Sequence, residues 1–342
     1  MNFLQSKLPT WGAAATVTFI LLLPLTLGAE AQDKIYVMKI TAPTLNAGPD
    51  LYARRLATAV EKDSGGRIKA EVYPASQLGA IPRQIEGTQF GSIQCAVIPP
   101  EFFVGVDERF EVLGAPGLVS SVAQGQRVAA DPEVLKLMLG LGADKGLHGV
   151  GLFMVEPSEV IAKNPIRHLA DFKGKKLRIF ASAFQSVAFQ RLGATPVAMS
   201  PGDVMPAIQQ GALDGAVAGV ELLNGLHFND AAKYITMSNH AAIFGIAEVS
   251  KKWYDSLPTD LQQIIDRDGA SESLAFNPQD VKTLTSARKG WLDAGGELIE
   301  LPADERSAML KILASVGADV SNNKPALSAA YKLASEAAQR AQ

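Results

Sequence analysis

The sequence is poor in the residues on which covalent cross-links and metal sites depend. It has a single cysteine, Cys95, and four histidines among 342 residues. One cysteine excludes an internal disulfide framework, and its apolar neighbours favour a buried structural thiol over a reactive one. The histidines lie far apart along the chain, so no two of them pair at metal-ligand spacing. We therefore predict neither a metal site nor another cofactor.

A strong excess of charge of one sign is missing as well. The chain has 32 lysine and arginine residues against 35 aspartate and glutamate residues, a formal net charge of -3. No stripe of lysine and arginine stands out in the sequence. Nucleic acid and an anionic membrane surface are therefore not expected as partners, because both are recognised through clustered positive charge.

Catalytic signatures are absent from the sequence too. It contains no H-E-x-x-H, CxxC or G-x-S-x-G motif and no Walker-type phosphate loop. Asp171 and Asp230 each follow a histidine by three residues, which is a weak metal signal. Scattered acidic side chains are most often solvated surface groups. We predict no catalytic residues, and an enzyme is the weakest of the function classes considered.

The longest apolar run lies near the N-terminus. Lys7 precedes it, residues 13–27 are apolar or small apart from three threonines, and Ala29-Glu30-Ala31 has the small-x-small pattern of a signal-peptidase site. The alternative is a membrane anchor, but an apolar core of about fifteen residues is shorter than the roughly 20 needed to span a bilayer. We predict a cleavable signal peptide over residues 1–31 and export to a Gram-negative periplasm, which suits a protein without disulfides.

The rest of the chain is predicted to be α/β. Its 311 residues (342 − 31) exceed one ordinary core and suggest two domains or lobes. Strand and helix patterns alternate over residues 34–98 and again over about 156–218, the rhythm of a mostly parallel sheet covered by helices. A strand over residues 241–249 and long helical stretches follow. We predict lobe I from residues 32–153 plus about 241–270, and lobe II from residues 154–240 plus the C-terminal helical region to 342.

Two observations nominate ligand-binding residues. Ligands of open α/β sheets bind beyond the carboxyl ends of the strands, which nominates Thr41 and the segment from Pro99 to Glu101 as walls of a site. In addition, Arg178 lies in an otherwise apolar strand pattern. A buried guanidinium must find an anionic or hydrogen-bonding partner, and we expect that partner to be the carboxylate of a small ligand.

Several motifs together give a family resemblance. They are G-G-R-I-K-A-E-V-Y-P-A-S-Q-L-G from Gly65, G-K-K-L-R-I-F from Gly174, A-L-D-G from Ala212, A-K-Y-I-T-M-S-N-H from Ala232 and S-K-K-W-Y-D-S-L-P from Ser250. In this order they resemble the solute-binding proteins of TRAP (tripartite ATP-independent periplasmic) transporters, dicarboxylate type. The resemblance implies a two-lobed Venus-flytrap fold, type II-like, with interlobe crossing strands and a long bracing helix. It also implies delivery of a solute to a sodium-coupled permease, without catalysis.

The resemblance also assigns roles to residues. In that family the arginine of a G-x-K-x-R strand forms a bidentate pair with the ligand carboxylate, and Arg178 occupies this position; the alternative is an interlobe or helix-capping salt bridge. Many relatives have a second arginine where this chain has Ser158-Glu159, and D-G-x-E-N-P where it has Val217 and Ala218 after D-G-A. Because the site then has fewer charged and polar side chains than in those relatives, we predict that the ligand is a monocarboxylate with an apolar or weakly polar body.

The remaining candidates each have two readings. Phe180 and Pro201 are either apolar walls of the site or ordinary core. Glu159 either faces inward, where it would suit an amine or a hydroxyl of the ligand, or lies on the surface. His240 either donates a hydrogen bond to the ligand or is a structural histidine. A monomer is expected. The alternative function is a periplasmic ligand-sensing protein coupled to a membrane signalling partner.

Overall fold

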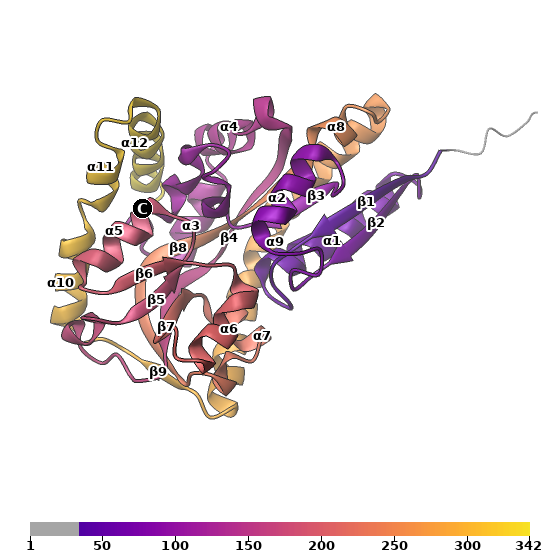
Figure 1. Cartoon of the computed structure of the whole chain (residues 1–342). Coiled ribbons are helices and arrows are strands. Elements are labelled where there is room, and N and C mark those ends of the chain that lie inside the picture. Colours follow the sequence, from indigo (N-terminus) through magenta and orange to yellow (C-terminus); the bar gives the residue numbers. More distant parts are fainter. Residues whose placement is uncertain (1–33) are drawn as a thin grey trace, which may run out of the picture. The chain divides into compact units, whose positions relative to one another are not determined.

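A mixed sheet carries the fold (Figure 1). The computed structural model describes residues 34–342, apart from the side chains of residues 277–282, and the predicted signal peptide over residues 1–31 lies outside the described residues. Within them, nine strands pair in the order β2-β1-β3-β8-β4-β7-β5-β6, with β9 beside β8. We call residues 35–153 the first lobe and residues 154–240 the second lobe.

The first lobe starts with alternating strands and helices, as predicted. They are β1 (Tyr36–Thr41), α1 (Gly48–Asp63), β2 (Ile68–Tyr73), α2 (Ile81–Phe90) and β3 (Cys95–Ile98). β1 pairs in parallel with both β2 and β3. The 3₁₀ helices η1 (Pro100–Phe103) and η2 (Glu108–Gly114) and the α-helices α3 (Val122–Ala129) and α4 (Pro132–Gly140) follow. The first lobe is therefore a parallel sheet edge with helical connections.

The second lobe repeats this pattern. It contains β5 (Lys176–Ile179), α5 (Ala183–Arg191), β6 (Thr195–Ala198), α6 (Pro201–Gln209) and β7 (Gly215–Ala218). β5 pairs in parallel with β6 and β7, so the carboxyl ends of these three strands lie at one edge. The candidate residue Arg178 belongs to β5, and Val217 and Ala218 belong to β7. The chain continues into the short helix α7 (Val220–Gly225).

Two long strands, β4 (Leu147–Ala162) and β8 (Tyr234–Ser250), run antiparallel through both lobes. Near its end β8 pairs with β3, where Val249 is opposite Cys95. The other end of β4 pairs with β7, where Glu159 is opposite Ala218. The register of the two strands shifts at two places between Met154 and Val160. These irregularities mark the passage between the lobes, and the predicted crossing strands are confirmed.

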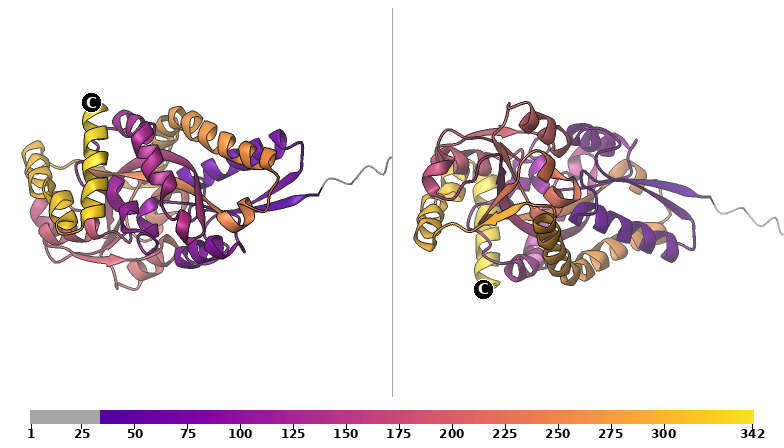
Figure 2. Two further views of the ribbon diagram at one scale, coloured as in Figure 1. Left: turned by 90° about the horizontal axis from the view of Figure 1, so that it is seen from above. Right: turned by 90° about the horizontal axis from the view of Figure 1, so that it is seen from below.

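The helix α9 (Thr259–Asp293) lies along both lobes, against α1 and α7 (Figure 2). Near its start Leu261 and Ile265 are buried in a cluster with residues of β1 and α1. Near its end Trp291 is buried in a cluster with residues of β7 and α7. One helix thus buries apolar side chains in both lobes, which confirms the predicted bracing helix.

The C-terminal helices divide between the lobes. α10 (Ala303–Leu313) and α11 (Val316–Ser321) pack against α5 of the second lobe, whereas α12 (Pro325–Arg340) packs against η2, α3 and α4 of the first. Gln124 in α3 donates from Nε2 to the carbonyl oxygen of Ala338 at 2.7 Å. The predicted lobe II included all of this region, whereas α12 contacts the first lobe; the lobe boundaries themselves stay a prediction.

The remaining elements are short. They are η3 (Ala143–Lys145), η4 (Leu169–Phe172), η5 (Phe228–Asp230), α8 (Lys251–Tyr254) and β9 (Glu297–Ile299). None of the helices in the described residues is both long enough and apolar enough to cross a membrane.

Candidate functional site at the lobe boundary

The guanidinium of Arg178 is held by backbone carbonyls. Nε donates to the carbonyl oxygen of Met199 and Nη1 to that of Val217, each at 2.8 Å. Nη2 has no hydrogen-bond partner in the described part of the chain, although the residue is only 1% exposed. Burial lowers the pKa of Arg178 to about 9, so the group is still a cation at neutral pH. A buried, charged donor without a partner is costly unless a ligand satisfies it.

Two phenylalanine rings lie close to this guanidinium. The Cζ atom of Arg178 lies 4.6 Å from the ring centroid of Phe180 and 5.8 Å from that of Phe102. The two rings stack on each other with their centroids 5.4 Å apart. Phe102 belongs to η1 of the first lobe and Phe180 follows β5 of the second. The arginine therefore lies at the lobe boundary, where ring faces stabilise a cation.

Glu101, the neighbour of Phe102, is a buried polar residue of the first lobe. It is fully buried, and neither carboxylate oxygen has a hydrogen-bond partner among residues 34–342. Burial raises the pKa of Glu101 to about 8, and the charge of Arg178 opposes that rise. At neutral pH Glu101 is therefore mostly a neutral acid, which can donate one hydrogen bond and accept others.

Hydrogen bonds between buried residues join the two lobes at two further places. Glu221 of α7 accepts from the backbone N–H of Gly48, at the start of α1, at 3.2 Å. Glu111 of η2 accepts from Ser182 Oγ at 2.9 Å and from the backbone N–H of Phe184 at 3.2 Å. These contacts join the two lobes through buried groups, and Arg178 itself is buried.

A second polar group lies where the strands cross. Ser238 Oγ is 2.8 Å from His240 Nδ1 and 3.2 Å from the carbonyl oxygen of Ser158. Glu159 accepts from the backbone N–H of Asn239 at 3.0 Å. Glu159 is 1% exposed, so its predicted alternative place on the surface is wrong. Burial raises the pKa of Glu159 to about 8, and the hydrogen bond from Asn239 opposes that rise.

His240 is buried as well, and its ring lies edge-on against Phe189 with the centroids 5.1 Å apart. Burial lowers the pKa of His240 to about 4, so its imidazole is neutral at pH 7. Within residues 34–342, His240 Nε2 and Ser158 Oγ have no hydrogen-bond partner. Two neutral polar groups at the strand crossing are thus available to a ligand or a water, but no contact joins them to Arg178.

The other candidates divide into two groups. Val217 contributes its carbonyl oxygen to Arg178, and Pro99 directly precedes η1, which carries Glu101 and Phe102. Ala218 and Pro201 are buried at the carboxyl-end edge of the second lobe. Thr41 is buried at the end of β1, where its hydroxyl lies 3.5 Å from the carbonyl oxygen of Tyr73. No contact brings Thr41 to Arg178, and the assignment of binding residues stays a prediction.

Sequence reasoning missed Phe102 and Glu221. Phe102 follows the nominated segment from Pro99 to Glu101, so the proline pair after a buried strand was the available signal. Glu221 pairs with Gly48, which is remote in sequence, and no local pattern marks it. Cys95 is a buried free thiol, as predicted, and burial raises its pKa. In the described part of the chain no three His, Cys, Asp or Glu side chains come together to hold a metal ion.

Two lobes joined by crossing strands, with an unsatisfied arginine enclosed between them, define a two-lobed solute-binding protein of the α/β class. Residues 49–323 match the model of the family described as bacterial extracellular solute-binding protein, family 7. The chain belongs to this family, which confirms the resemblance to TRAP solute-binding proteins. Its members are solute receptors rather than enzymes.

Individual relatives agree with this assignment. The chain is 28% identical over 300 residues to the C4-dicarboxylate-binding periplasmic protein DctP of Rhodobacter capsulatus, covering 86% of this chain and 89% of that one. It is 30% identical over 212 residues to the uncharacterized protein YiiZ of Salmonella typhimurium, covering 62% of this chain and 65% of YiiZ.

A solved structure has the same fold. It is a TRAP periplasmic solute-binding protein from Desulfovibrio salexigens with bound orotic acid, and it superposes with a TM-score of 0.83 at 23% identity. The match covers 90% of this chain and 100% of that protein. At this level of identity the likeness is evidence of the fold alone.

Proposed function

We propose that this chain is the extracytoplasmic receptor of a TRAP transporter and that it binds a small organic-acid anion through Arg178. The carrying observation is Nη2 of Arg178, a buried guanidinium nitrogen without a partner among residues 34–342. A carboxylate there would replace the missing hydrogen bond and neutralise the buried charge. The names of two relatives fit this class, since one is called C4-dicarboxylate-binding and another structure holds orotic acid.

The ligand proposed here has one carboxylate and an apolar or weakly polar body. The chain has Ser158 at the position where many relatives have a second arginine. Val217 and Ala218 likewise stand where many relatives have a glutamate and an asparagine. The neighbouring Glu101 is neutral at pH 7 because burial raises its pKa to about 8. It therefore does not repel the ligand carboxylate, and it offers a hydrogen bond to a hydroxyl, keto or amino group near that carboxylate.

Binding would proceed by closure of the lobes. Because Arg178 and Phe180 come from the second lobe and Glu101 and Phe102 from the first, a ligand between them contacts both lobes only in the closed form. Such a ligand shifts the population from open to closed by its differential affinity for the two forms. The closed, monomeric receptor would then deliver its solute to a sodium-coupled permease, after export by the N-terminal signal peptide.

A thermal-shift screen of organic acids tests the ligand class, because a ligand that binds only the native state raises the melting temperature. The panel pairs each monocarboxylate with a dicarboxylate of similar size, for example benzoate with phthalate and lactate with malate. The expected result is a larger shift for the monocarboxylate of the pair that binds. Larger shifts with the dicarboxylates would show that the single-carboxylate proposal is wrong.

A further inference from the structure

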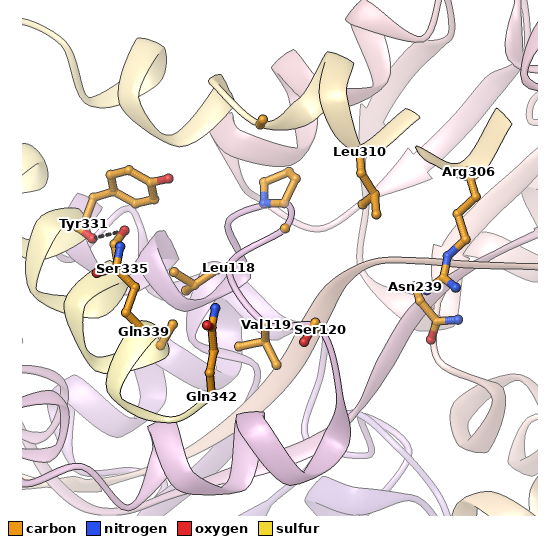
Figure 3. Close-up of a pocket in the computed structure, with 14 residues that line it drawn as sticks. Leu118, Val119, Ser120, Asn239, Arg306, Leu310, Tyr331, Ser335, Gln339 and Gln342 are labelled. Carbon is orange, nitrogen blue, oxygen red and sulfur yellow. Dashed lines mark hydrogen bonds between the residues drawn. The ribbon is translucent and has the colours of Figure 1, made fainter. Parts of the chain in front are cut away.

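A groove separate from the enclosed site lies between the first lobe and the C-terminal helices (Figure 3). Its volume is about 370 Å³, and its walls come from the segment around Leu118, from β8 at Asn239, from α10 and from α12. Arg178 is not among the residues that line it. The groove is therefore a distinct candidate for a small-molecule site.

The groove contains an arginine without a counter-ion. In the described part of the chain the Arg306 side chain has neither an ion pair nor a hydrogen bond, and its Nε atom is buried. No Asp or Glu is among the residues that line the groove. Figure 3 shows the guanidinium reaching down from α10 toward the amide of Asn239. The planar guanidinium of an arginine in this setting can donate two hydrogen bonds to an anion.

Asn239 turns its side chain into the groove through an unusual backbone. Its φ is 45°, in the left-handed region that asparagine adopts more readily than most residues. The backbone N–H of Asn239 donates to the carboxylate of buried Glu159 at 3.0 Å, and this hydrogen bond holds the backbone of Asn239 in place. The Asn239 amide is thus available to a ligand, and it can donate a second hydrogen bond to an anion held by Arg306.

The rest of the groove is lined by apolar and polar side chains, the polar ones being Ser120, Ser335, Gln339, Gln342 and the Tyr331 hydroxyl. Leu118 and Val119 contribute from the first lobe, Leu310 from α10, and Tyr331 and Ala338 from α12. In Figure 3 Leu310 lies on the same side as Arg306, and Leu118 and Val119 lie toward the middle of the groove. Tyr331 lies on the far side, together with Ser335, Gln339 and Gln342. A cation without a counter-ion, with apolar side chains beside it and in the middle of the groove, matches an organic anion with an apolar body.

We propose that this groove binds an organic anion with an apolar body, its carboxylate on Arg306 and Asn239 and its body along Leu118 and Leu310. Most residues that line the groove are exposed or partly exposed, so the ligand enters without separation of the lobes. The proposal does not depend on the solute that binds at Arg178.

Octanoate is a suitable probe, with octanamide as the uncharged match. We expect octanoate to bind the full chain with a dissociation constant of about 1 mM or lower, and octanamide to bind at least about ten-fold more weakly because it lacks the charge. Arg306→Gln should weaken octanoate binding at least about ten-fold, whereas Arg178→Ala should leave it within about two-fold. Titration calorimetry or chemical-shift titration measures these constants.

Two further variants make the outcome decisive. Asn239→Gly tolerates the positive φ and removes only the amide, so it should weaken octanoate binding without unfolding the protein. Arg191→Gln, an arginine paired with Asp319 outside the groove, should leave octanoate binding unchanged. No binding of octanoate, equal binding to the Arg306→Gln variant, or loss of binding in the Arg178→Ala variant would each overturn the proposal.

Discussion

The two arginines that are proposed to bind anions lie in opposite surroundings. Arg178 is buried at the lobe boundary, donates to two carbonyl oxygens and lies close to two aromatic rings. Arg306 lines a groove that is open to solvent, and its side chain has no partner within residues 34–342. The contrast teaches that a charge buried at a lobe boundary makes binding depend on a conformational change. A charge in an open groove makes binding depend on local complementarity alone.

Arg178→Ala should give the largest effect on this contrast. The variant should lower the affinity for the acid with the largest thermal shift by at least about 2 kcal/mol, the cost of losing a charge-assisted hydrogen bond in a buried site. Calorimetric titration measures the affinity, and circular dichroism checks the fold. Arg306→Gln is the matched control and should retain full affinity for that acid. An unchanged affinity in a folded Arg178→Ala variant would show that the ligand carboxylate does not bind Arg178.

Gly225→Ala tests whether the enclosed site needs lobe contact. A Cβ atom at Gly225 of α7 would lie 2.4 Å from the carbonyl oxygen of Leu45 in the first lobe, so the closed form must shift to accept it. We expect the affinity for the same acid to fall about ten-fold, or about 1.4 kcal/mol, while octanoate binding in the groove is unchanged. Gly202→Ala is the control, because nothing lies within 4 Å of its added Cβ. Equal affinities in the two variants would contradict the closure model.

The smallest effect on ligand affinity is expected from pH, which acts mainly on the stability of the fold. Glu101 ionises near pH 4.5 in the unfolded chain and near pH 8 in the folded one, so between these values the folded state binds one more proton. The free energy of unfolding should therefore fall as pH rises through this window, by up to about 1.4 kcal/mol per pH unit. Glu101→Gln should make that slope shallower in denaturant titrations between pH 5 and 8, while Glu159, whose pKa burial also raises to about 8, keeps its own contribution.

The same ionisation distinguishes the two anion sites. As pH rises from 7 to 8, Glu101, whose pKa burial raises to about 8, becomes partly ionised, and the enclosed site should bind its acid up to a few-fold more weakly. The Glu101→Gln variant should keep its affinity over this range, because the pKa of Arg178 is about 9 and its charge is retained. Octanoate binding in the groove should be insensitive to this change, since its lining has no carboxylate side chain. Parallel pH profiles for the two ligands would argue against this difference between the sites.

Features that depend on neighbouring residues, or on motifs within one stretch of the chain, could be predicted from the sequence. Arg178 stood out because a charge interrupted an apolar strand, and the crossing strands and bracing helix came with the family resemblance. Phe102 was missed because an aromatic residue after a buried strand has the same signature as ordinary core. Glu221 depends on its contact with Gly48, and α12 joins the first lobe through hydrogen bonds to residues near 124. Such pairings between remote segments leave no periodicity in the chain.

The crossing strands also set the order in which the protein can assemble. β3 is completed by β8, with Cys95 opposite Val249, a separation of 249 − 95 = 154 residues. Closing so long a loop carries a large entropy cost and slows folding. The β1–β3 sheet of the first lobe therefore has an unpaired edge until the strand near residue 250 arrives. A chain that crosses a membrane N-terminus first would therefore remain incompletely folded for most of its passage, and an incompletely folded chain can pass through a narrow channel.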